Sequence, residues 1–334
     1  MHRIIAASIS LIAIIMTANL AFAEAKTLCV YDPGGASGDA YQIIKDYRTA
    51  AAGWGVEFTL KPYTDEKTAA DDFKAGQCDA VVLTGTRVRR FQKFSGTIEA
   101  MGGLPTYAHL KKVVKALANP KAGKLLKSGD FETAGILPGG AVYLLVNDRS
   151  INTVEKMAGK RLAVLEYDKA AKVMVSHVGA SSVSADMATF AGMFNNGNVA
   201  MCYAPAIAYH ALELHKGLGN KGGIIRYPLA QVTFQILIRS AGFPAEFPNA
   251  SRKWAASNFN RFKALATQAE KKIAKKYWVD ISDDDKDRYD RMFRETRILL
   301  RDDKKVYSKK MLKMLRKIRC KVDGTRSECA DKKE

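Results

Sequence analysis

Short β-rich runs alternate with helical segments along most of this chain, and that alternation restricts the fold more than any other feature. Residues 27–31, 57–60 and 80–83 have the apolar, β-rich composition of strands, whereas residues 39–52 and 65–75 carry apolar side chains at helical spacing. Strands joined by helices pair in parallel through right-handed crossovers. We therefore expect a parallel sheet with helices on both faces, and ligands of such sheets bind beyond the carboxyl ends of the strands.

The same pattern returns after a connecting stretch with helices near residues 107–118. The expected elements are strands at 141–146, 161–165, 199–203 and 231–239, with helices at 169–178 and 188–195. From residue 249 to residue 317 the pattern is almost wholly helical, with an interruption at 280–285, where Ser282 can cap the next helix. A calcium loop is disfavoured there, because the acidic run lacks the alternating ligand spacing and the glycine of an EF-hand.

The chain is long enough for two separately cored lobes. After removal of a leader about 310 residues remain, more than one compact core usually supports. The hydrophobic content of 47% and the charged content of 26% are ordinary for a folded globular protein. We expect an α/β fold divided into a signal peptide at 1–23, a first lobe at 24–133, a second lobe at 134–238, and a helical segment at 239–334 that braces the lobes.

The amino-terminal residues have the features of an export signal. His2 and Arg3 precede an apolar run, and small residues at Ala21 and Ala23 suit the export peptidase. Cleavage is expected after Ala23, which places the mature protein in the periplasm. Cys29 is not directly after the cut, so a lipid anchor is not expected. No later apolar run is long enough to cross a membrane, so no integral membrane segment is expected either.

The five cysteines are expected to pair in an oxidising compartment, with one left over. Cys29 begins the first strand and Cys78 precedes the third, so the two thiols lie at the same sheet edge if these strands are parallel neighbours. Cys320 and Cys329 flank a short turn near the carboxyl end. The sequence thus predicts disulfides Cys29–Cys78 and Cys320–Cys329. Cys202 is left as a buried small apolar residue, with a catalytic thiol as the alternative.

The formal net charge is +19, and basic residues gather near the carboxyl end, where residues 301–319 hold nine lysines or arginines. Such a surface is typical of a solvated face, of an acidic protein or membrane contact, or of nucleic-acid binding. Export and the lack of interleaved aromatic side chains argue against nucleic acid as a partner. A solvated face and an acidic partner both stay open.

Two strand-end loops of the first lobe are candidate ligand-binding segments. The turn after the first strand supplies Asp32, Pro33, Gly34, Gly35, Ser37 and Gly38. Its glycines let a ligand approach the backbone amides that open the next helix. The turn matches neither a Rossmann nor a Walker loop, so nucleotide binding has little support. The loop after the third strand supplies Thr84, Gly85, Thr86 and Arg87. Its arginine suits a carboxylate. A structural turn and a helix cap are the alternative interpretations.

The corresponding loops of the second lobe supply Glu166, Tyr167, Tyr203 and Pro205. Tyrosines suit the wall of a ligand site, although buried tyrosines are also ordinary core residues. The five histidines show no metal-binding spacing, and no nucleophile motif is present. We therefore expect no metal, no cofactor and no enzyme activity.

A resemblance to a known family runs from residue 150 to residue 205. Residues 150–164, Ser-Ile-Asn-Thr-Val-Glu-Lys-Met-Ala-Gly-Lys-Arg-Leu-Ala-Val, resemble the short helix, glycine and basic-flanked strand of the extracytoplasmic receptors of tripartite ATP-independent periplasmic (TRAP) transporters. Residues 178–180, Val-Gly-Ala, and 193–199, Met-Phe-Asn-Asn-Gly-Asn-Val, are similar to later stretches of those receptors. The resemblance implies a two-lobe type II periplasmic-binding-protein-like fold with C-terminal helices, in a divergent branch.

The resemblance also implies a function. Such a receptor captures a small organic solute, anionic solutes included, between its lobes for a membrane transporter. In these receptors an arginine four residues after the glycine clamps the ligand carboxylate, whereas here that position is Ala163. Arg161 lies on the same face but is displaced by roughly 6 to 7 Å, so whether it replaces the clamp is open. The alternative function is an accessory interaction protein of an envelope transport or efflux assembly.

Overall fold

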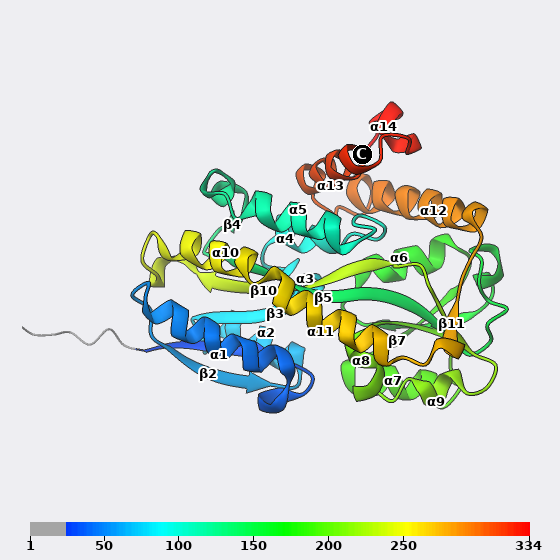
Figure 1. Ribbon diagram of the computed structural model, residues 1–334, viewed down its shortest axis with the longest axis horizontal. Helices are drawn as coiled ribbons and strands as arrows, with labels where there is room; N and C mark the ends of the chain where they lie inside the picture. Colours follow the sequence, from blue (N-terminus) through cyan, green and yellow to red (C-terminus); the bar gives the residue numbers. More distant parts are fainter. Residues whose placement is uncertain (1–24) are drawn as a thin grey trace, which may run out of the picture.

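The computed structural model describes residues 25–334 (Figure 1). Its strands form one mixed sheet, whose main path runs in the order β2-β1-β3-β10-β5-β8-β6-β7. The expected signal peptide, with its cleavage after Ala23, lies outside the described residues. Within residues 25–334, none of the helices has both the length and the apolar composition that a membrane crossing requires.

Three parallel strands form one end of the sheet, as the alternating pattern predicts. This group comprises β1 (Lys26–Tyr31), β2 (Phe58–Tyr63) and β3 (Ala80–Thr84), with the 3-10 turn η1 (Gly35–Ser37) and helices α1 (Asp39–Ala52) and α2 (Glu66–Ala75) between them. β2 extends further than expected because it pairs with β1 from Lys26, opposite Phe58, to Tyr31, opposite Tyr63. The apolar face of α1 buries its tyrosines and isoleucines against this part of the sheet.

Two long antiparallel strands form the middle of the sheet. β5 (Phe131–Val146) pairs from Phe131 to Val142 with β10 (Ala230–Arg239), which in turn pairs with β3. Its last residues, from Val142 to Val146, pair with β8 in the other group of strands. The sequence predicted only the last part of β5, because Pro138, Gly139 and Gly140 interrupt the strand pattern. A register shift between Val232 and Thr233 of β10 lies opposite these three residues and bends the ladder there.

A second group of parallel strands forms the other end of the sheet. It comprises β6 (Arg161–Leu165), β7 (Ser181–Ala185) and β8 (Met201–Pro205), with α6 (Lys169–His177), α7 (Met187–Asn195), α8 (Ala206–Ala211), α9 (His215–Leu218) and the short strands β9 (Gly223–Ile225) and β11 (Trp278–Val279). β7 has no counterpart among the expected elements. It is an edge strand that pairs with β6, and its exposed serines give no apolar signal.

Short helices connect the two groups of strands. They are α3 (Gly85–Val88), α4 (Lys93–Gly96), η2 (Thr97–Glu99), α5 (Tyr107–Leu117) and η3 (Pro120–Leu125), and they are followed by the short strand β4 (Lys127–Ser128). Three further 3-10 turns lie elsewhere in the chain, η4 (Glu155–Met157), η5 (Ser240–Gly242) and η6 (Lys275–Tyr277). α5 is the helix expected near residues 107–118. Thr106 caps it by accepting a hydrogen bond from the His109 amide.

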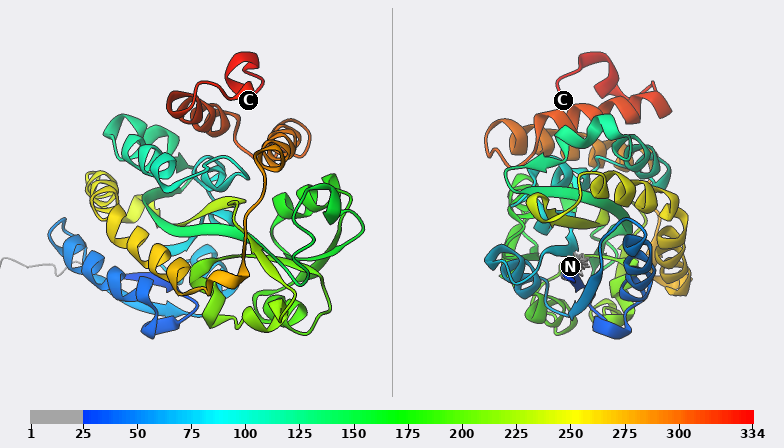
Figure 2. Two further views of the ribbon diagram at one scale, coloured as in Figure 1. Left: turned by 45° about the vertical axis from the view of Figure 1, so that its right-hand side comes forward. Right: turned by 90° about the vertical axis from the view of Figure 1, so that its left-hand side faces the viewer.

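The carboxyl-terminal region is helical, as expected. It comprises α10 (Phe247–Ser257), α11 (Phe259–Lys272), α12 (Asp283–Asp302), α13 (Lys309–Val322) and α14 (Ser327–Asp331). Ser282 caps α12 by accepting from the Asp285 amide, which is the predicted role of that serine. α10 and α11 pack on β5. α12 contacts α6 of the second group of strands and α13 contacts α5 of the connecting segment, so these two helices lie over both (Figures 1 and 2).

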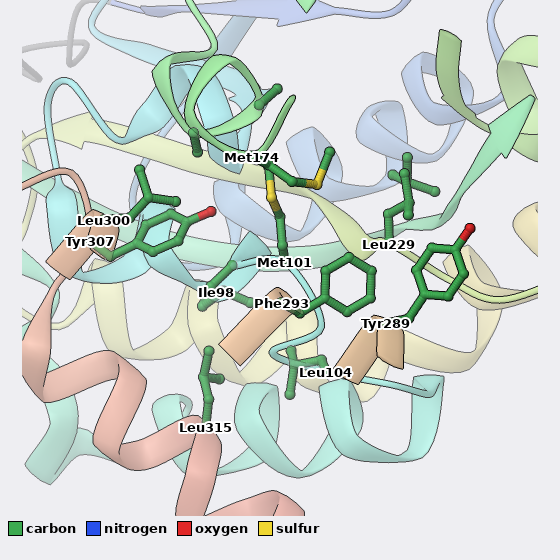
Figure 3. Close-up of a cluster of buried hydrophobic side chains, with 14 of the residues drawn as sticks. Ile98, Met101, Leu104, Met174, Leu229, Tyr289, Phe293, Leu300, Tyr307 and Leu315 are labelled. Carbon is green, nitrogen blue, oxygen red and sulfur yellow. The ribbon is translucent and has the colours of Figure 1, made fainter. Parts of the chain in front are cut away.

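The apolar core is divided in a way that fits two lobes. One cluster of buried side chains lies around β1 to β3, and another lies around β8, α7 and α9. A third cluster joins the two sides beneath α12 and α13, where Phe293 and Leu315 meet Met101 from the connecting segment and Met174 from α6 (Figure 3). The two-lobe α/β fold is thus confirmed, with the carboxyl-terminal helices packed across it.

The lobe boundaries stay a prediction, and the structure adds a complication to them. β10 lies inside the segment expected to form the second lobe, yet it pairs with β3 of the first. β5 spans both groups of strands. Any boundary drawn along the sequence therefore crosses these two strands.

Both predicted disulfides are present. Cys29 in β1 is bonded to Cys78, which precedes β3, and Cys320 in α13 is bonded to Cys329 in α14. Cys202 is the remaining cysteine, and it is fully buried in β8. Burial raises the pKa of its thiol well above the ordinary value, so this residue has the character of a small apolar side chain and lacks that of a reactive thiolate.

Candidate functional site

The carboxyl ends of β1 and β3 face those of β6 and β8 across a cleft, which we call the interlobe cleft. Its main chamber has a volume of about 140 Å³. Aromatic and aliphatic side chains form most of the wall, among them Tyr31, Pro33, Leu165, Tyr167, Met187, Phe190, Tyr203, Pro205, Ile207, Val232 and Phe234. A smaller inner chamber of about 70 Å³ shares Thr86, Glu99 and Asp168 with the main one and extends to Met174 and Tyr307.

The structure brings part of the predicted site together. The residues that line the main chamber are Pro33, Thr84, Thr86, Tyr167, Tyr203 and Pro205. Asp32 and Gly34 line an adjoining hollow of about 200 Å³ between η1, α8 and α11, and Arg87 lies at the mouth of the cleft. The predicted residues that line none of these spaces are Gly35, Ser37, Gly38, Gly85, Arg161 and Glu166.

The glycine-rich turn after β1 binds a carboxylate of the chain itself. Asp32 is buried, and its Oδ1 accepts from the Gly34 amide at 2.7 Å while its Oδ2 accepts from the Tyr41 amide at 3.0 Å. A Cβ atom at Gly38 would lie 2.0 Å from the carboxyl carbon of Asp32. Gly38 is therefore required so that the carboxylate can reach the start of α1. The amides of Gly34 and Tyr41 in this segment are therefore already occupied.

The loop after β3 is arranged in the same way around Glu99. Glu99 is buried, and its carboxylate accepts from the amides of Gly85, Thr86 and Thr233 at 2.6 to 2.8 Å and from both threonine hydroxyls. A Cβ atom at Gly85 would approach Glu99 Oε1 to 2.6 Å. Burial raises the pKa of Glu99, while the hydrogen bonds from Thr233 and Thr86 act in the opposite direction.

On the other side of the cleft, Asp168 occupies the start of α6. Its Oδ1 accepts from the amides of Ala170 and Ala171 at 3.1 Å, and its Oδ2 accepts from the Tyr203 hydroxyl at 3.3 Å. Burial, together with the nearby charge of Asp168, raises the pKa of Tyr203 well above its ordinary value. Tyr203 is therefore a neutral wall residue whose hydroxyl proton is already donated.

Tyr167 bridges the cleft by lying between Glu66 and Arg87, and we call these three residues the latch. The Tyr167 hydroxyl donates to Glu66 Oε2 at 3.0 Å, and the Arg87 guanidinium carbon lies 3.3 Å from the centre of the Tyr167 ring. Arg87 Nε is 3.5 Å from the same Glu66 oxygen. Tyr167 follows β6, whereas Glu66 and Arg87 belong to the first strand group. The latch therefore joins the two sides of the cleft directly.

The ion pair in the latch is buried but incompletely satisfied. The side chains of Arg87 and Glu66 are 5% and 1% exposed, and Arg87 Nε has no hydrogen-bond partner among the described residues. Burial raises the pKa of Glu66, and the charge of Arg87 and the hydrogen bond from Thr84 oppose that rise. Tyr167 is thus the residue of the second strand group that covers this buried pair.

Arg161 does not replace the arginine that the resemblance implied at position 163. It is the first residue of β6 and is exposed, whereas the cleft lies beyond the last residue of that strand. Ala163 is fully buried in the second apolar cluster. Glu166 is also exposed, and its carbonyl group accepts from Lys172. The sequence placed Arg161 and Glu166 near the site because both lie in or next to β6. Arg161 is at the opposite end of that strand from the cleft, and Glu166 is exposed to solvent, so neither side chain lines the cavity.

Several important cleft residues were missed by sequence reasoning. Glu66 lies in the first turn of α2, Glu99 ends η2, and Tyr307 lies between α12 and α13. Each is separated along the chain from the loops that it joins, so no local spacing marks it. The glycines at 38 and 85 were the available signal, because each leaves room for a carboxylate from elsewhere. Across residues 25–334 there is no cluster of side chains suited to a metal ion.

The family of the chain follows from comparison with known proteins. Residues 51–334 match the family described as solute-binding protein AdeT 1/2. The probable solute-binding protein AdeT1 of Acinetobacter baumannii is 42% identical over 301 residues, covering 90% of this chain and 99% of the relative. AdeT2 of the same organism is 26% identical over 235 residues, covering 70% of this chain and 98% of the relative.

Solved structures of TRAP periplasmic solute-binding proteins share the fold. The protein from Desulfovibrio salexigens superposes with a TM-score of 0.72 at 14% identity, covering 89% of this chain and 99% of that one. The protein from Haemophilus influenzae gives a TM-score of 0.71 at 12% identity, covering 88% and 99%. These likenesses confirm the expected TRAP receptor fold. With the two-sided cleft and the family match, they show that the chain belongs to the AdeT 1/2 family and is a solute-binding receptor.

Proposed function

We propose that this receptor captures a small organic solute in the interlobe cleft and presents it to a transporter in the inner membrane, without making or breaking a covalent bond. The observation that carries the proposal is a chamber whose walls come from strand ends on both sides of the sheet. The structures from Desulfovibrio salexigens and Haemophilus influenzae hold orotic acid and L-gulonate. Those ligands support a small organic molecule as the class of guest.

The proposed binding residues are the predicted ones that line the main chamber, together with wall residues that only the structure identified. The set is Pro33, Thr84, Thr86, Tyr167, Tyr203 and Pro205, joined by Tyr31, Phe190 and Phe234. Aromatic rings give large apolar contact area in such a wall. Arg161 and Glu166 are not part of the proposed site.

The mechanism is hinge closure around the guest. The two sides of the sheet are joined through β5 and β10, and the bend at Gly139 and Gly140 lies opposite the register shift in β10. Gly140 has a φ of 122°, a conformation that favours glycine. Rotation about this bend would part Tyr167 from Glu66 and Arg87 and open the cleft. A bound solute would favour the closed form by contacting both sides.

The test is ligand-dependent stabilisation with a variant that fills the chamber. Ala204 is 5% exposed and lines the main chamber, so Ala204→Trp would occupy the space of the guest. The matched control is Ala52→Trp, at the exposed end of α1. We expect saturable thermal stabilisation by a solute, found by native mass spectrometry, in the wild type and the control. Equal stabilisation of Ala204→Trp would show that the guest binds elsewhere.

A basic surface at the mouth of the cleft supports a second element of the proposal, contact with an acidic face of the membrane partner. The mouth is lined by Arg87, Arg89, Arg90, Lys93, Lys169, Lys304 and Lys305. We expect the fourfold change of Lys304, Lys305, Lys309 and Lys310 to Glu to abolish salt-sensitive capture of the envelope complex. The control reverses the exposed Lys112, Lys115, Lys121 and Lys124 around α5 and η3. Equal loss in both variants would indicate a general charge effect.

The proposal places the mature protein in the periplasm, with the signal peptide removed after Ala23. Edman sequencing or intact-mass measurement of the exported protein checks this site directly. A mature chain that begins at Glu24 is the expected result, and any other start would correct it.

A further inference from the structure

The guanidinium of Arg89 has no acidic partner, unlike the arginines on either side of it. Arg87 is paired with Glu66 at 3.5 Å, and Arg90 is paired with an aspartate of α2 at 2.9 Å. The hydrogen bond of Arg89 runs from Nε to the Gly96 carbonyl at 3.2 Å. Among residues 25–334 its Nη1 and Nη2 groups have no acceptor and no carboxylate within ion-pair distance. A guanidinium edge of this kind suits the two oxygens of a carboxylate.

Contacts on both sides of Arg89 hold its side chain in place. A Cβ atom at Gly96 would lie 2.5 Å from the Arg89 Cα, so the absence of a side chain there lets α4 pack directly against the Arg89 backbone. The guanidinium carbon lies 5.0 Å from the centre of the Tyr307 ring, which is drawn in Figure 3. Because Gly96 and Tyr307 already orient the guanidinium, less conformational entropy is lost when its free edge binds an anion.

Arg89 lies where the inner chamber meets the mouth of the cleft. It lines both spaces, and in the described part of the chain it is the cationic side chain of the inner chamber. The inner chamber shares Thr86 and Tyr203 with the main one. A solute whose body fills the main chamber can therefore extend an acidic group toward Arg89. Lysines of α6 and of the segment between α12 and α13 line the mouth and add positive potential along this approach.

The acidic side chains of the inner chamber have hydrogen-bond donors of their own. Glu99 accepts from the amides of Gly85, Thr86 and Thr233 and from both threonine hydroxyls. Asp168 accepts from two amides of α6 and from a tyrosine hydroxyl. Burial raises the pKa of Glu99, so this group holds its negative charge less strongly than an ordinary carboxyl group. These acids therefore leave the free edge of the guanidinium to a solute.

We propose that Arg89 anchors the carboxylate of a small organic acid at the inner end of the interlobe cleft, through the free Nη1 and Nη2 edge of its guanidinium. This inference rests on the proposed receptor function and names the residue that determines its specificity. The apolar wall of the main chamber binds the body of the solute, and Arg89 binds its acidic group. The anchor belongs to the loop after β3, across the cleft from the strand in which the TRAP resemblance implied an arginine and the chain has Ala163.

The experiment compares organic acids with their uncharged amides. The pairs are phenylacetate and phenylacetamide, 3-hydroxyphenylacetate and its amide, indole-3-acetate and its amide, and hexanoate and hexanamide, all at neutral pH. Isothermal titration measures Kd for the wild type and for Arg89→Gln. The matched control is Arg48→Gln, which removes an exposed positive charge from α1 of the same lobe. Ala204→Trp shows whether a compound binds in the main chamber.

We expect at least one acid to bind the wild type at least about tenfold more tightly than its amide, because charge-assisted hydrogen bonds are stronger than neutral ones. Arg89→Gln should weaken that acid by at least about tenfold and its amide by less than about threefold. Arg48→Gln should leave both affinities unchanged. Retained amide binding in Arg89→Gln would also show that the cleft is intact in that variant.

The outcomes that contradict the inference differ from those that contradict the receptor function. If an amide binds the wild type as tightly as its acid, or if Arg89→Gln keeps the preference for the acid, Arg89 is not the anchor and the receptor function stands. Equal loss of the acid in Arg89→Gln and Arg48→Gln also overturns the inference, because net charge alone would explain it. If no compound binds, or if binding survives in Ala204→Trp, the proposed function fails and the inference falls with it.

A second variant, Arg89→Lys, separates recognition of the carboxylate from a structural role. It keeps the positive charge and removes the planar fork of the guanidinium. We expect its affinity for the acid to lie between those of the wild type and Arg89→Gln, with the amide unchanged, in a protein whose fold is verified by circular dichroism. If the acid and the amide lost affinity by the same factor in folded Arg89→Lys, Arg89 would act only on the structure of the cleft, which contradicts the inference.

Discussion

Ionised side chains are buried both beside the cleft and beneath α13 and α14, and the two groups are paired to different degrees. The carboxyl-terminal group consists of Arg297, Arg319, Glu328 and Glu334. In it Arg319 contacts Glu328 at 2.5 Å and Glu334 at 2.6 Å, and Arg297 contacts Glu334 at 2.9 Å. Arg297 and Arg319 also donate to the carbonyl groups of Met101 and Gly103 at 2.8 Å. In the latch, Arg87 and Glu66 meet at 3.5 Å and Arg87 Nε is left without a hydrogen bond.

The pKa values of the carboxyl groups record the same difference. Burial acts to raise the pKa of Glu328, but the charges and hydrogen bonds of its arginine partners outweigh burial and lower the pKa to about 2. For Glu66 burial outweighs Arg87, and the pKa is raised. The carboxyl-terminal group therefore ties α12, α13 and α14 together through fully paired charges, whereas the ion pair of the latch is incompletely paired.

The largest effect is expected when the carboxyl-terminal group loses a cation. Arg319→Ala leaves Glu328 and Glu334 buried with too little positive charge, which costs about 3 to 5 kcal/mol in the free energy of unfolding. Urea denaturation measures this cost. The control is Lys286→Ala, whose pair with Asp283 is exposed and contributes less than about 1 kcal/mol. If Arg319→Ala lowered the free energy of unfolding by less than about 1 kcal/mol, the carboxyl-terminal group would stabilise the fold no more than an exposed ion pair does.

Acid is expected to weaken the carboxyl-terminal group next. The folded pKa of Glu328 lies at about 2, below its ordinary value of 4.5, so its stabilisation is fully present above about pH 4.5. It is lost as the pH falls through about 2, with a total of about 3 kcal/mol. Denaturation curves from pH 2 to 6 should show wild type and Glu328→Gln converging at low pH. If the difference in the free energy of unfolding between the two proteins did not change with pH, Glu328 would not be the group whose titration weakens this region.

Removal of the Cys320–Cys329 disulfide should have a somewhat smaller effect, confined to the same region. The bond closes a loop with a sequence separation of 9, for which loop-closure entropy gives about 2 to 3 kcal/mol. Cys320→Ser combined with Cys329→Ser should raise amide hydrogen exchange in α14 and at the end of α13. Solute affinity should be unchanged. A change in solute affinity would show that the Cys320–Cys329 region is coupled to the cleft.

The smallest effect on stability is expected at the latch. Tyr167→Phe keeps the ring against Arg87 and removes the hydrogen bond to Glu66, a loss of about 1 kcal/mol. The closed form should become several-fold less populated, which small-angle scattering and solute affinity can detect, while the urea midpoint moves little. Tyr203→Phe is the control, since its hydroxyl donates to Asp168 on the same side of the cleft. If Tyr167→Phe and Tyr203→Phe opened the cleft equally, the hydrogen bond of the latch would have no specific role in closing it.

Local sequence patterns predicted the parts of the molecule that local interactions stabilise. The parallel strands, the helices that follow them and the Ser282 cap fall where apolar periodicity and capping residues placed them. The Cys29–Cys78 pair followed from the expectation that β1 and β3 are neighbours. β7 was missed because a polar edge strand depends on its partner more than on its own side chains.

The site was predicted only in outline. The strand-end loops were located correctly, but their glycine-rich amides were interpreted as free for a ligand. Asp32 lies within its own turn and could have been recognised as a cap. Glu99 could not, because it reaches the β3 loop and Thr233 from 14 and 134 residues away. Tyr307 lines the inner chamber from the segment between α12 and α13. The sequence predicted for this segment only that it braces the two lobes.

By itself the sequence determined the order of strands and helices, the cysteine pairs and the general position of a cleft, because backbone hydrogen bonding and apolar burial act over short stretches of chain. Tertiary structure alone decided which charges line that cleft. Glu66, Arg87 and Tyr167 meet only after the sheet has formed and its two sides have closed. The electrostatic character of the site depends on desolvation and on distances of a few ångströms, and neither quantity is encoded in the spacing of residues along the chain.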